Sequence, residues 1–380
     1  MNIRHIIKGI RKTLAYHEPL ITVSISKKNL LHNLHAYQER YPDIRIAPVL
    51  KSNAYGHGLI PVAEILDTED IAFFAVDSLY EAEKLRRSGI RSRITVMGYV
   101  RPEYIADSSI RNVDYAITDI EQLRELSRLA DKSVRLHIKL DTGMHRHGIL
   151  PTDLEEAIAL LEANTHLRVV GVCSHFADAD NVDPSFSNQQ IASWKKMLAM
   201  LDAAFRTIEY RHLAATKGIR FSDSSCMNTA RIGMGLFGYD MSPVDEVTLL
   251  PVLEMRALIT SIREIPEGDA VGYNTTFRAK RASRIATVPV GYFEGVDRGL
   301  SNRGSFMVNG KEAPIAGRVS MNMTSIDVTD IPDAKRGDTV VIIGRDPEKP
   351  NSIAEIAKLD ETSPYVITVH IAEHLRRVVE

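Results

Sequence analysis

Short apolar runs alternate with helical patterns through the first two thirds of the chain, and this alternation constrains the fold more than any other feature. Between most of the runs lie segments with helical periodicity, such as LIPVAEIL and DLEEAIALLEA. Strands that alternate with helices form parallel sheets, and eight such units are typical of a (β/α)8 TIM barrel. We therefore expect an α/β fold with an N-terminal barrel, whose strands are residues 46–51, 72–76, 94–99, 115–118, 134–141, 169–175, 212–216 and 232–238.

The pattern changes near residue 250. The segments that follow are β-branched runs separated by Gly, Pro, Asp and Asn, with little helical periodicity. Such a pattern predicts a C-terminal all-β domain. We divide the chain into an N-terminal extension (residues 1–19), a barrel (20–250) and a β domain (251–380). The alternating stretch ITVSIS at 21–26 is expected to be a strand lent to the second domain.

Composition narrows the class of protein. The net charge of −2 gives no reason to expect nucleic acid or an anionic membrane as a partner. The only cysteines, Cys173 and Cys226, are too few for a disulfide framework or a zinc cluster, and they suit a reducing cytoplasm. Charges interrupt the amphipathic first residues, so these are not read as a secretory signal. No stretch approaches the roughly 20 apolar residues of a membrane span. We expect a cytoplasmic protein with no membrane partner.

Polar and cationic residues gather where the expected barrel strands end. Barrel enzymes place their chemistry there, in the loops that follow the strands. Taken singly, each residue could have a purely structural role. A lysine at the end of a strand can extend its amine to solvent, and an arginine near an aspartate can form a plain ion pair. Their convergence on one barrel mouth favours a functional site. The residues are Lys51, Tyr55, Lys139, Asp141, Arg146, His175, Thr216, Gly218, Arg231 and Gly233.

This set suits a carbonyl cofactor held by lysine. The Lys51 amine, in a partly dry pocket, could form a Schiff base with pyridoxal 5'-phosphate. Arg231 would be the partner of the pyridine nitrogen. A cation there disfavours a proton on the ring nitrogen, weakens the ring as an electron sink and favours simple proton exchange at Cα. The phosphate could bind Tyr55, Thr216 and the backbone near Gly233, since barrel phosphate sites commonly follow strands seven and eight.

Seven blocks of the sequence occur in the order found in one family. They are VLKSNAYGHG, KLDTGMHRHG, SHFADAD, RIGMGLFGY, VGYNTTF, VPVGYFEG and GRVSMNM. From about residue 20 to its end, the chain resembles the alanine racemases. The resemblance implies a pyridoxal-phosphate-dependent isomerase that interconverts L- and D-alanine and supplies D-alanine for peptidoglycan in the cell wall. It also implies a head-to-tail homodimer with shared active sites.

The resemblance assigns roles to residues of both domains. Lys51 would hold the cofactor and act as one base, and Tyr273 of the other subunit would be the opposite base. Two bases on opposite faces of Cα suit a racemisation. Arg231 would face the pyridine nitrogen, and His175 would link Arg231 to Tyr273. Lys139 matches a lysine that is carbamylated in many members, where its negative charge orients the arginine. The phosphate would be bound by Tyr55, Thr216, Gly233 and Tyr365, and the substrate by Arg146, Met321 and Tyr292.

The chain departs from the family pattern at three places. Ala215-Thr216 stands where Asn-Ser is usual, Asn322 stands where Asp is usual, and His145 and His147 flank Arg146. These departures leave open a racemase of broader specificity, for serine or larger amino acids, although a bulky Tyr365 would narrow the side-chain pocket.

Two other classes share parts of the pattern. A basic-amino-acid decarboxylase would lack Tyr273 and carry a cysteine in the β domain, whereas both cysteines here fall in the barrel. A non-catalytic pyridoxal-phosphate carrier would be a lone barrel, without the second domain.

Overall fold

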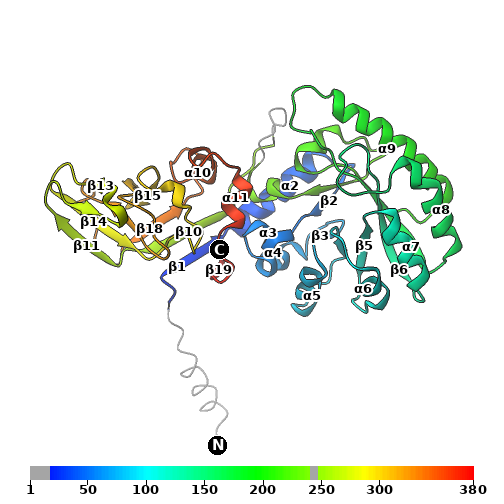
Figure 1. Ribbon diagram of the computed structural model, residues 1–380, viewed down its shortest axis with the longest axis horizontal. Coiled ribbons are helices and arrows are strands. Elements are labelled where there is room, and N and C mark those ends of the chain that lie inside the picture. Colours follow the sequence, from blue (N-terminus) through cyan, green and yellow to red (C-terminus); the bar gives the residue numbers. More distant parts are fainter. Residues whose placement is uncertain (1–17, 240–246) are drawn as a thin grey trace, which may run out of the picture. The chain divides into compact units, whose positions relative to one another are not determined.

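The computed structural model describes residues 18–239 and 247–380, which form two compact units (Figure 1). One unit is built mainly from Met255–Ile343, and the other from Ser24–Glu254 together with Gly344–Glu373. Gly344–Glu373 therefore groups with the barrel and not with the strands that precede it in the sequence. The predicted division between residues 250 and 251 stays a prediction. The predicted extension, residues 1–19, lies almost entirely outside the described residues. Within the described ranges, every helix is too short or too polar to cross a membrane.

Eight parallel strands form the barrel of the second unit. β3 to β8 make a six-stranded parallel sheet, and β2 pairs in parallel with β9. Bridges from Val49 to Ala75 and from Ala215 to Arg231 join these two sheets into a closed barrel. The predicted (β/α)8 barrel is therefore confirmed. The strands are β2 (Arg45–Pro48), β3 (Phe74–Val76), β4 (Ile94–Val96), β5 (Val113–Ile117), β6 (Val134–Lys139), β7 (Leu167–Cys173), β8 (Tyr210–His212) and β9 (Thr229–Ile232).

The last two barrel strands lie earlier in the chain than predicted. We expected them at 212–216 and 232–238, but β8 ends at His212 and β9 ends at Ile232. Both are followed by 3₁₀ turns, η2 (Thr216–Phe221) and η3 (Met234–Phe237). A short apolar run such as MGLF, without β-branched residues, fits a helical turn as well as a strand, which explains the error. Arg231 consequently lies inside β9 and not before it.

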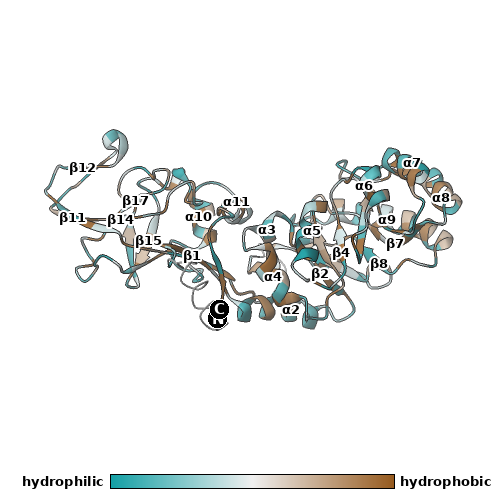
Figure 2. Cartoon of the chain, turned by 90° about the horizontal axis from the view of Figure 1, so that it is seen from below, coloured by the Kyte–Doolittle hydropathy of each residue, from teal (hydrophilic) through white to brown (hydrophobic). Residues whose placement is uncertain are grey.

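Helices surround the barrel strands (Figure 1). Their buried residues recur with helical periodicity, as in Leu154, Ala157 and Leu161, so that each helix turns one apolar face inward. Figure 2 shows the resulting mixture of hydrophobic and hydrophilic residues along α7 and α8. Side chains of Ser78 and Asp119 cap the starts of two helices. The helices are α2 (Lys27–Arg40), α4 (Leu59–Leu66), α5 (Leu79–Arg87), α6 (Pro102–Asp107), α7 (Ile120–Leu129), α8 (Leu154–Ala163) and α9 (Ser185–Ala204).

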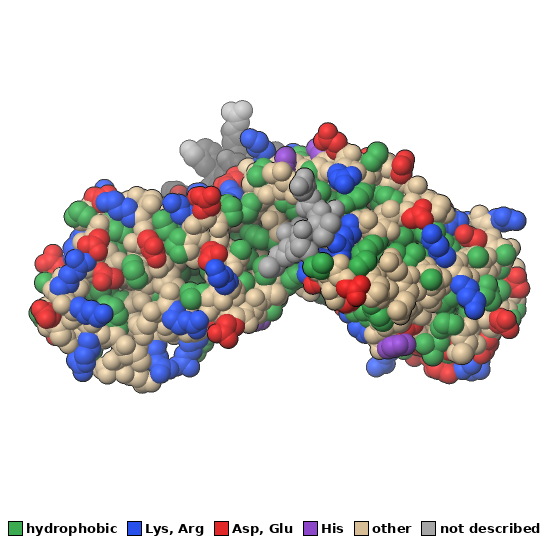
Figure 3. Space-filling view, turned by 90° about the horizontal axis from the view of Figure 1, so that it is seen from above, with side chains coloured by type: hydrophobic (Ala, Val, Ile, Leu, Met, Phe, Trp, Pro, Cys, Tyr) green, Lys and Arg blue, Asp and Glu red, His purple; other side chains and the backbone are tan. Residues whose placement is uncertain are grey.

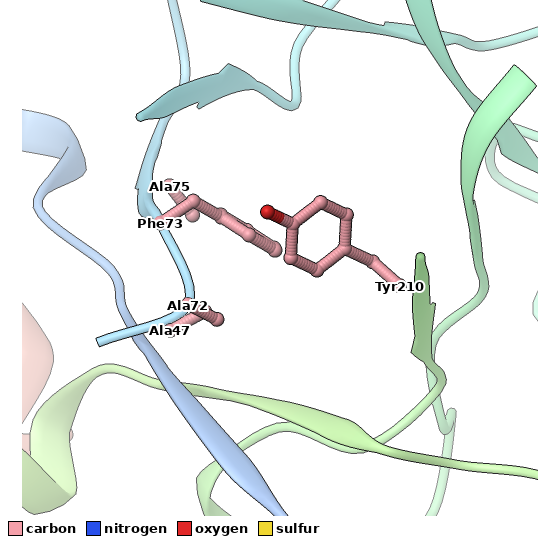
Figure 4. Close-up of a cluster of buried hydrophobic side chains, with 5 residues drawn as sticks. All are labelled: Ala47, Ala72, Phe73, Ala75 and Tyr210. Carbon is pink, nitrogen blue, oxygen red and sulfur yellow. The ribbon is translucent and has the colours of Figure 1, made fainter. Parts of the chain in front are cut away.

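Large and small side chains together fill the barrel interior. The rings of Phe73 and Tyr210 meet edge to face with their centroids 5.1 Å apart, and Figure 4 shows them pointing toward each other. Ala47, Ala72 and Ala75 pack beside them. The interior is thus a packed core that supports the loops at the barrel mouth.

The other unit is mainly antiparallel sheet, as predicted. A six-stranded sheet has the order β16-β15-β18-β10-β1-β19, of which β19 groups with the unit that contains the barrel, and β11, β14 and β17 form a second sheet. The predicted strand at 21–26 is observed as β1, between β10 and β19. The strands are β1 (Ile21–Ile25), β10 (Leu253–Leu258), β11 (Ser261–Ile265), β12 (Ala270–Val271), β13 (Phe277–Arg278), β14 (Ser283–Val288), β15 (Ser305–Val308), β16 (Lys311–Pro314), β17 (Thr324–Asp327), β18 (Thr339–Ile343) and β19 (Arg377–Val379).

Two helices near the C-terminus were not predicted. They are α10 (Ile353–Leu359) and α11 (Pro364–Val369), and both belong to the unit that contains the barrel. Their sequences, IAEIAKL and PYVITV, are too short to show a clear helical periodicity after a long series of predicted strands. Over the face seen in Figure 3, basic and acidic side chains are interspersed, in keeping with the small net charge.

Candidate active site

A pocket of about 690 Å³ opens at the carboxyl ends of the barrel strands. Its lining comes from the loops after most of the strands and from one residue of α11. Ten of the predicted site residues lie in this lining, so residues from widely separated parts of the sequence share one cavity. They are Lys51, Tyr55, Lys139, Arg146, His175, Thr216, Gly218, Arg231, Gly233 and Tyr365.

The chain after β2 makes a left-handed turn that begins at Lys51 (α3, Lys51–Tyr55). Ser52 to Tyr55 all have φ between 51° and 56°, a region that residues with a Cβ rarely adopt. Contacts from outside the turn compensate for this strain. Glu81 Oε1 accepts the Ser52 N–H at 2.7 Å, and Asn53 Oδ1 accepts the Leu59 N–H at 2.8 Å. The turn lets Lys51 and Tyr55, only four residues apart, both line the pocket.

His57 supports the same turn from inside the protein. Its Nδ1 lies 3.1 Å from the carbonyl oxygen of Ala54 and 3.0 Å from that of Tyr55, and its ring stacks on Phe237. Burial lowers the pKa of His57 to about 3, so the ring is neutral. Because carbonyl oxygens only accept, Nδ1 carries the proton. His57 therefore shapes the turn and does not enter the pocket.

Three hydroxyl groups gather at one end of the pocket. The Tyr55 ring packs on Phe237 and meets Tyr365 edge-on, with the tyrosine centroids 5.9 Å apart. A Cβ on Gly233 would lie 2.6 Å from the Tyr55 hydroxyl oxygen, and Thr216 Oγ1 accepts the Gly233 N–H at 3.0 Å. Burial raises the pKa of Tyr55, so its hydroxyl remains a donor. Neutral hydroxyls of this kind fit a phosphate group, and the end of the pocket is therefore suited to pyridoxal phosphate.

Arg231 lies at the base of the pocket and is almost fully buried. Its Nη2 is 3.0 Å from His175 Nδ1 and donates to the Ser174 carbonyl oxygen at 2.8 Å. Its Nη1 is 2.8 Å from His212 Nδ1. Burial, followed by the charge of Arg231, lowers the pKa of His175 to about 3. The predicted contact of Arg231 with His175 is thus present, with His175 neutral and accepting.

A chain of buried polar groups continues behind Arg231 and was missed in the sequence analysis. His212 Nε2 lies 2.7 Å from His137 Nδ1, and His137 Nε2 lies 3.4 Å from Asp114 Oδ2. Asp114 also forms ion pairs with Arg93 and Arg135. Burial alone would raise the pKa of Asp114, but the hydrogen bond with His137 and the neighbouring charges bring it below its ordinary value. The available signal in the sequence was one histidine in each of two strands, VRLHIK and YRH.

Lys139 ends β6 in a cluster of cations. Burial, followed by the charges of Arg231, Arg146 and Lys51, lowers its pKa. Among the described residues, no carboxylate forms an ion pair with Lys139. Its amine is consequently neutral more often than that of an exposed lysine.

The loop after β6 carries Arg146 to the rim of the pocket. Asp141 accepts the N–H groups of Gly143 and His145, so its carboxylate holds the loop in shape. His145 and His147 are both exposed, and His147 also lines the pocket. Asp141 is not part of the pocket lining.

Three predicted site residues lie in the β-rich unit and are not part of the pocket lining. They are exposed in the single chain, with 69% of Tyr273, 45% of Tyr292 and 55% of Met321 accessible. Tyr273 begins the turn η4 (Tyr273–Thr275), in which Asn274 has a φ of 61°. The roles of these three residues stay predictions.

Comparisons with known proteins agree with the blocks noted in the sequence. The model of the alanine racemase N-terminal domain matches residues 25–241, and that of the C-terminal domain matches residues 252–379. The alanine racemase of Syntrophobacter fumaroxidans is 38% identical over 361 residues, which cover 93% of this chain and 95% of that protein. A crystal structure of the alanine racemase from Bacillus anthracis with bound L-Ala-P is 31% identical with a TM-score of 0.88, and 96% of each chain is covered. An alanine racemase structure from Clostridium difficile 630 has a TM-score of 0.89 at 28% identity, again over 96% of each chain. On the strength of both domain matches and these relatives, the chain belongs to the alanine racemase family.

Proposed function

We propose that the protein is a pyridoxal-phosphate-dependent racemase that interconverts L- and D-alanine and supplies D-alanine for peptidoglycan. The observation that carries this proposal is the meeting of Lys51, the Arg231–His175 pair and the hydroxyls of Tyr55 and Thr216 in one pocket. Bound pyridoxal phosphate supplies an electron sink that acidifies the Cα proton of the amino acid. The remaining chemistry falls to residues of the chain.

Lys51 is the base that we assign to one face of the substrate. It would hold the cofactor through its amine and exchange a proton with Cα. Tyr273 is the candidate for the opposite face, where its phenol would return a proton. Two bases explain how one site can produce either enantiomer, because a proton taken from one side is replaced from the other.

Arg231 controls the pyridine nitrogen in this proposal. A guanidinium is only a donor, so the ring nitrogen that faces it would accept its hydrogen bond and would carry no proton of its own. His175 is neutral and accepts from Arg231, which leaves Arg231 as the cation of that pair. The ring would be a modest electron sink, suited to proton exchange more than to bond cleavage elsewhere on the substrate.

We further propose that Lys139 is carbamylated. Its lowered pKa increases the fraction of free amine that can react with carbon dioxide, with loss of one proton. The resulting carbamate would place an anion among Lys51, Arg146 and Arg231. Arg146 could then be held in position for the cofactor's phenolic oxygen or the substrate carboxylate.

We also propose a cytoplasmic homodimer in which each active site receives residues of both subunits. The exposed Tyr273, Tyr292 and Met321 support this, because residues that contact a substrate need cover that a single chain does not supply. The free thiols of Cys173 and Cys226 are both buried, which suits a reducing compartment.

A chiral assay with purified protein tests the proposal. We expect interconversion of L- and D-alanine, and the variant Lys51→Ala should lose both this activity and the visible absorbance of the bound cofactor. Lys132→Ala, an exposed lysine on the barrel, is the matched control and should retain both. Activity and absorbance that survive in Lys51→Ala would contradict the assignment. The same assay with serine and larger amino acids decides between an alanine racemase and the broader alternative that Asn322 left open.

A further inference from the structure

Two loops of the β-rich unit are joined along their backbones. One contains Tyr292 and the other contains Met321, two of the three residues that the resemblance assigns to the substrate. The Tyr292 N–H donates to the Ser320 carbonyl oxygen at 3.1 Å, and the Phe293 N–H donates to the Met321 carbonyl oxygen at 3.0 Å. The positions of Tyr292 and Met321 are therefore coupled.

Gly291 allows the two loops to approach this closely. A Cβ at this position would lie 2.1 Å from the Ser320 carbonyl oxygen and 2.5 Å from that of Met321. Real Cβ atoms do not come so near to backbone atoms, so any other residue would force the loops apart. The two loops can therefore approach each other this closely only because residue 291 is a glycine.

A side-chain pair closes the other end of the same junction. Glu294 is only 5% exposed, and its Oε2 accepts the Gly291 N–H at 2.8 Å. Its Oε1 accepts from Nδ2 of Asn322 at 2.6 Å, across the two loops. In the described part of the chain, no cation forms an ion pair with Glu294. A buried carboxylate without a cation depends on its hydrogen-bond donors, and here these are the Gly291 N–H on one oxygen and the Asn322 amide on the other.

This pairing explains the residue type at position 322. An amide can donate to the Glu294 carboxylate, whereas an ionised Asp can only accept. Asp at 322 would therefore oppose a second carboxylate at hydrogen-bond distance. The asparagine is thus the complement of Glu294 and need not be a sign of a different substrate.

We propose that the Glu294–Asn322 hydrogen bond is a clamp that fixes Tyr292 and Met321 and thereby sets the enzyme's selectivity for the small side chain of alanine. This inference rests on the proposed function, in which both residues reach the substrate of the partner subunit. Glu294 and Asn322 are positioning residues, because they act only through the loops that they join. Loosening the clamp should admit the larger side chain of serine and weaken the grip on alanine.

Four forms of the protein test the pairing: wild type, Glu294→Gln, Asn322→Asp, and the double variant. In Glu294→Gln the Asn322 amide can turn and keep the hydrogen bond, so this isosteric variant is the matched control. Asn322→Asp opposes two carboxylates, and we expect KM for alanine to rise about tenfold with a much smaller change in kcat. The ratio of kcat/KM for alanine over serine should fall by a similar factor. The double variant restores a donor opposite a carboxylate and should recover most of both values.

Hydrogen exchange provides a readout that does not require activity. The amides of Tyr292 and Phe293 should exchange faster in Asn322→Asp and return to the wild-type rate in the double variant. Unchanged exchange, or a double variant that behaves like Asn322→Asp, would disprove the clamp. Altered exchange with an unchanged alanine-to-serine ratio would overturn its role in selectivity. An inactive wild type with the expected exchange pattern would instead refute the proposed function, and with it the selectivity, while leaving the clamp in place.

Discussion

The imidazoles of His212 and His137 face each other, with Nε2 of His212 2.7 Å from Nδ1 of His137. Together with the contact of His212 with Arg231, this fixes the tautomer of both rings. Arg231 only donates, so His212 must accept through Nδ1 and carry its proton on Nε2. That proton points to His137 Nδ1, which leaves the His137 proton on Nε2, facing Asp114. Burial lowers the pKa of both histidines, in agreement with two neutral rings. Arg231 is thus oriented from behind by groups that do not line the pocket.

Replacement of His137 tests this chain. In His137→Leu the buried His212 N–H loses its acceptor, which should lower the free energy of unfolding by about 1–3 kcal/mol. Arg231 should become less well oriented, so we expect a fall in kcat and a shift in the cofactor's visible spectrum. Urea unfolding and steady-state assays measure these effects. His166→Leu, at an exposed position, is the control. Equal stability and equal kcat in the two variants would contradict a role for the His212–His137 hydrogen bond in orienting Arg231.

Acid should destabilise the protein through its buried histidines. Each has a folded-state pKa below its ordinary value of 6.5, so the unfolded chain binds more protons between that pH and the folded pKa. Stability therefore falls as the pH drops below about 6.5, by up to about 1.4 kcal/mol per pH unit for each histidine, until its folded pKa is reached. For two of them the window extends to about 3. The residues are His57, His137, His175 and His212.

Urea midpoints measured from pH 7 to pH 4.5 check this expectation. His57→Asn keeps a donor for the turn but removes the titrating ring, so the pH slope of its stability should be smaller by about one proton. A slope identical to that of the wild type would show that His57 does not contribute.

Gly233 should be intolerant of even one added carbon. The Cβ of Gly233→Ala would lie 2.6 Å from the Tyr55 hydroxyl oxygen, so Tyr55 must move from the end of the pocket where we propose that the phosphate binds. We expect Kd for pyridoxal phosphate to rise about tenfold or more, which corresponds to about 1.4 kcal/mol. A titration followed by cofactor absorbance measures it. Adding Tyr55→Phe removes the clashing oxygen, so Gly233→Ala should raise Kd by a smaller factor in that background than in the wild type. If no clash existed, the factors for the two substitutions would multiply independently in the double variant.

Carbamylation of Lys139 can be observed directly. Protein incubated with ¹³C-bicarbonate should give a carbamate resonance in its carbon NMR spectrum, since the lowered pKa of Lys139 favours the free amine. Lys139→Gln should lose this resonance, and Lys132→Gln should keep it. A resonance that persists in Lys139→Gln would assign the modification to another amine.

The sequence predicted the barrel because alternation of strands and helices is a repeated signal, in which one misplaced element does not change the fold. It did not locate β8 and β9 correctly, since short apolar runs with glycine fit more than one local structure. Residues such as Lys51 and Arg231 were found because they stand in distinctive blocks near strand ends. His137 and His212 are 75 residues apart within strands, and no local pattern shows that their side chains meet. The Glu294–Asn322 pair was missed for the same reason, although Asn322 itself was noted.

The left-handed turn after Lys51 restricts which residues can follow the lysine, because positions 52–54 must tolerate a positive φ. Such a backbone costs about 1–2 kcal/mol for each residue with a Cβ, least for asparagine and most for β-branched residues. In a library randomised at positions 52–54, functional clones should therefore be enriched in glycine, asparagine and aspartate and depleted of valine and isoleucine, whatever their polarity. Selection there would act on backbone torsion, whereas one position earlier it would act on the side-chain amine that we propose holds the cofactor.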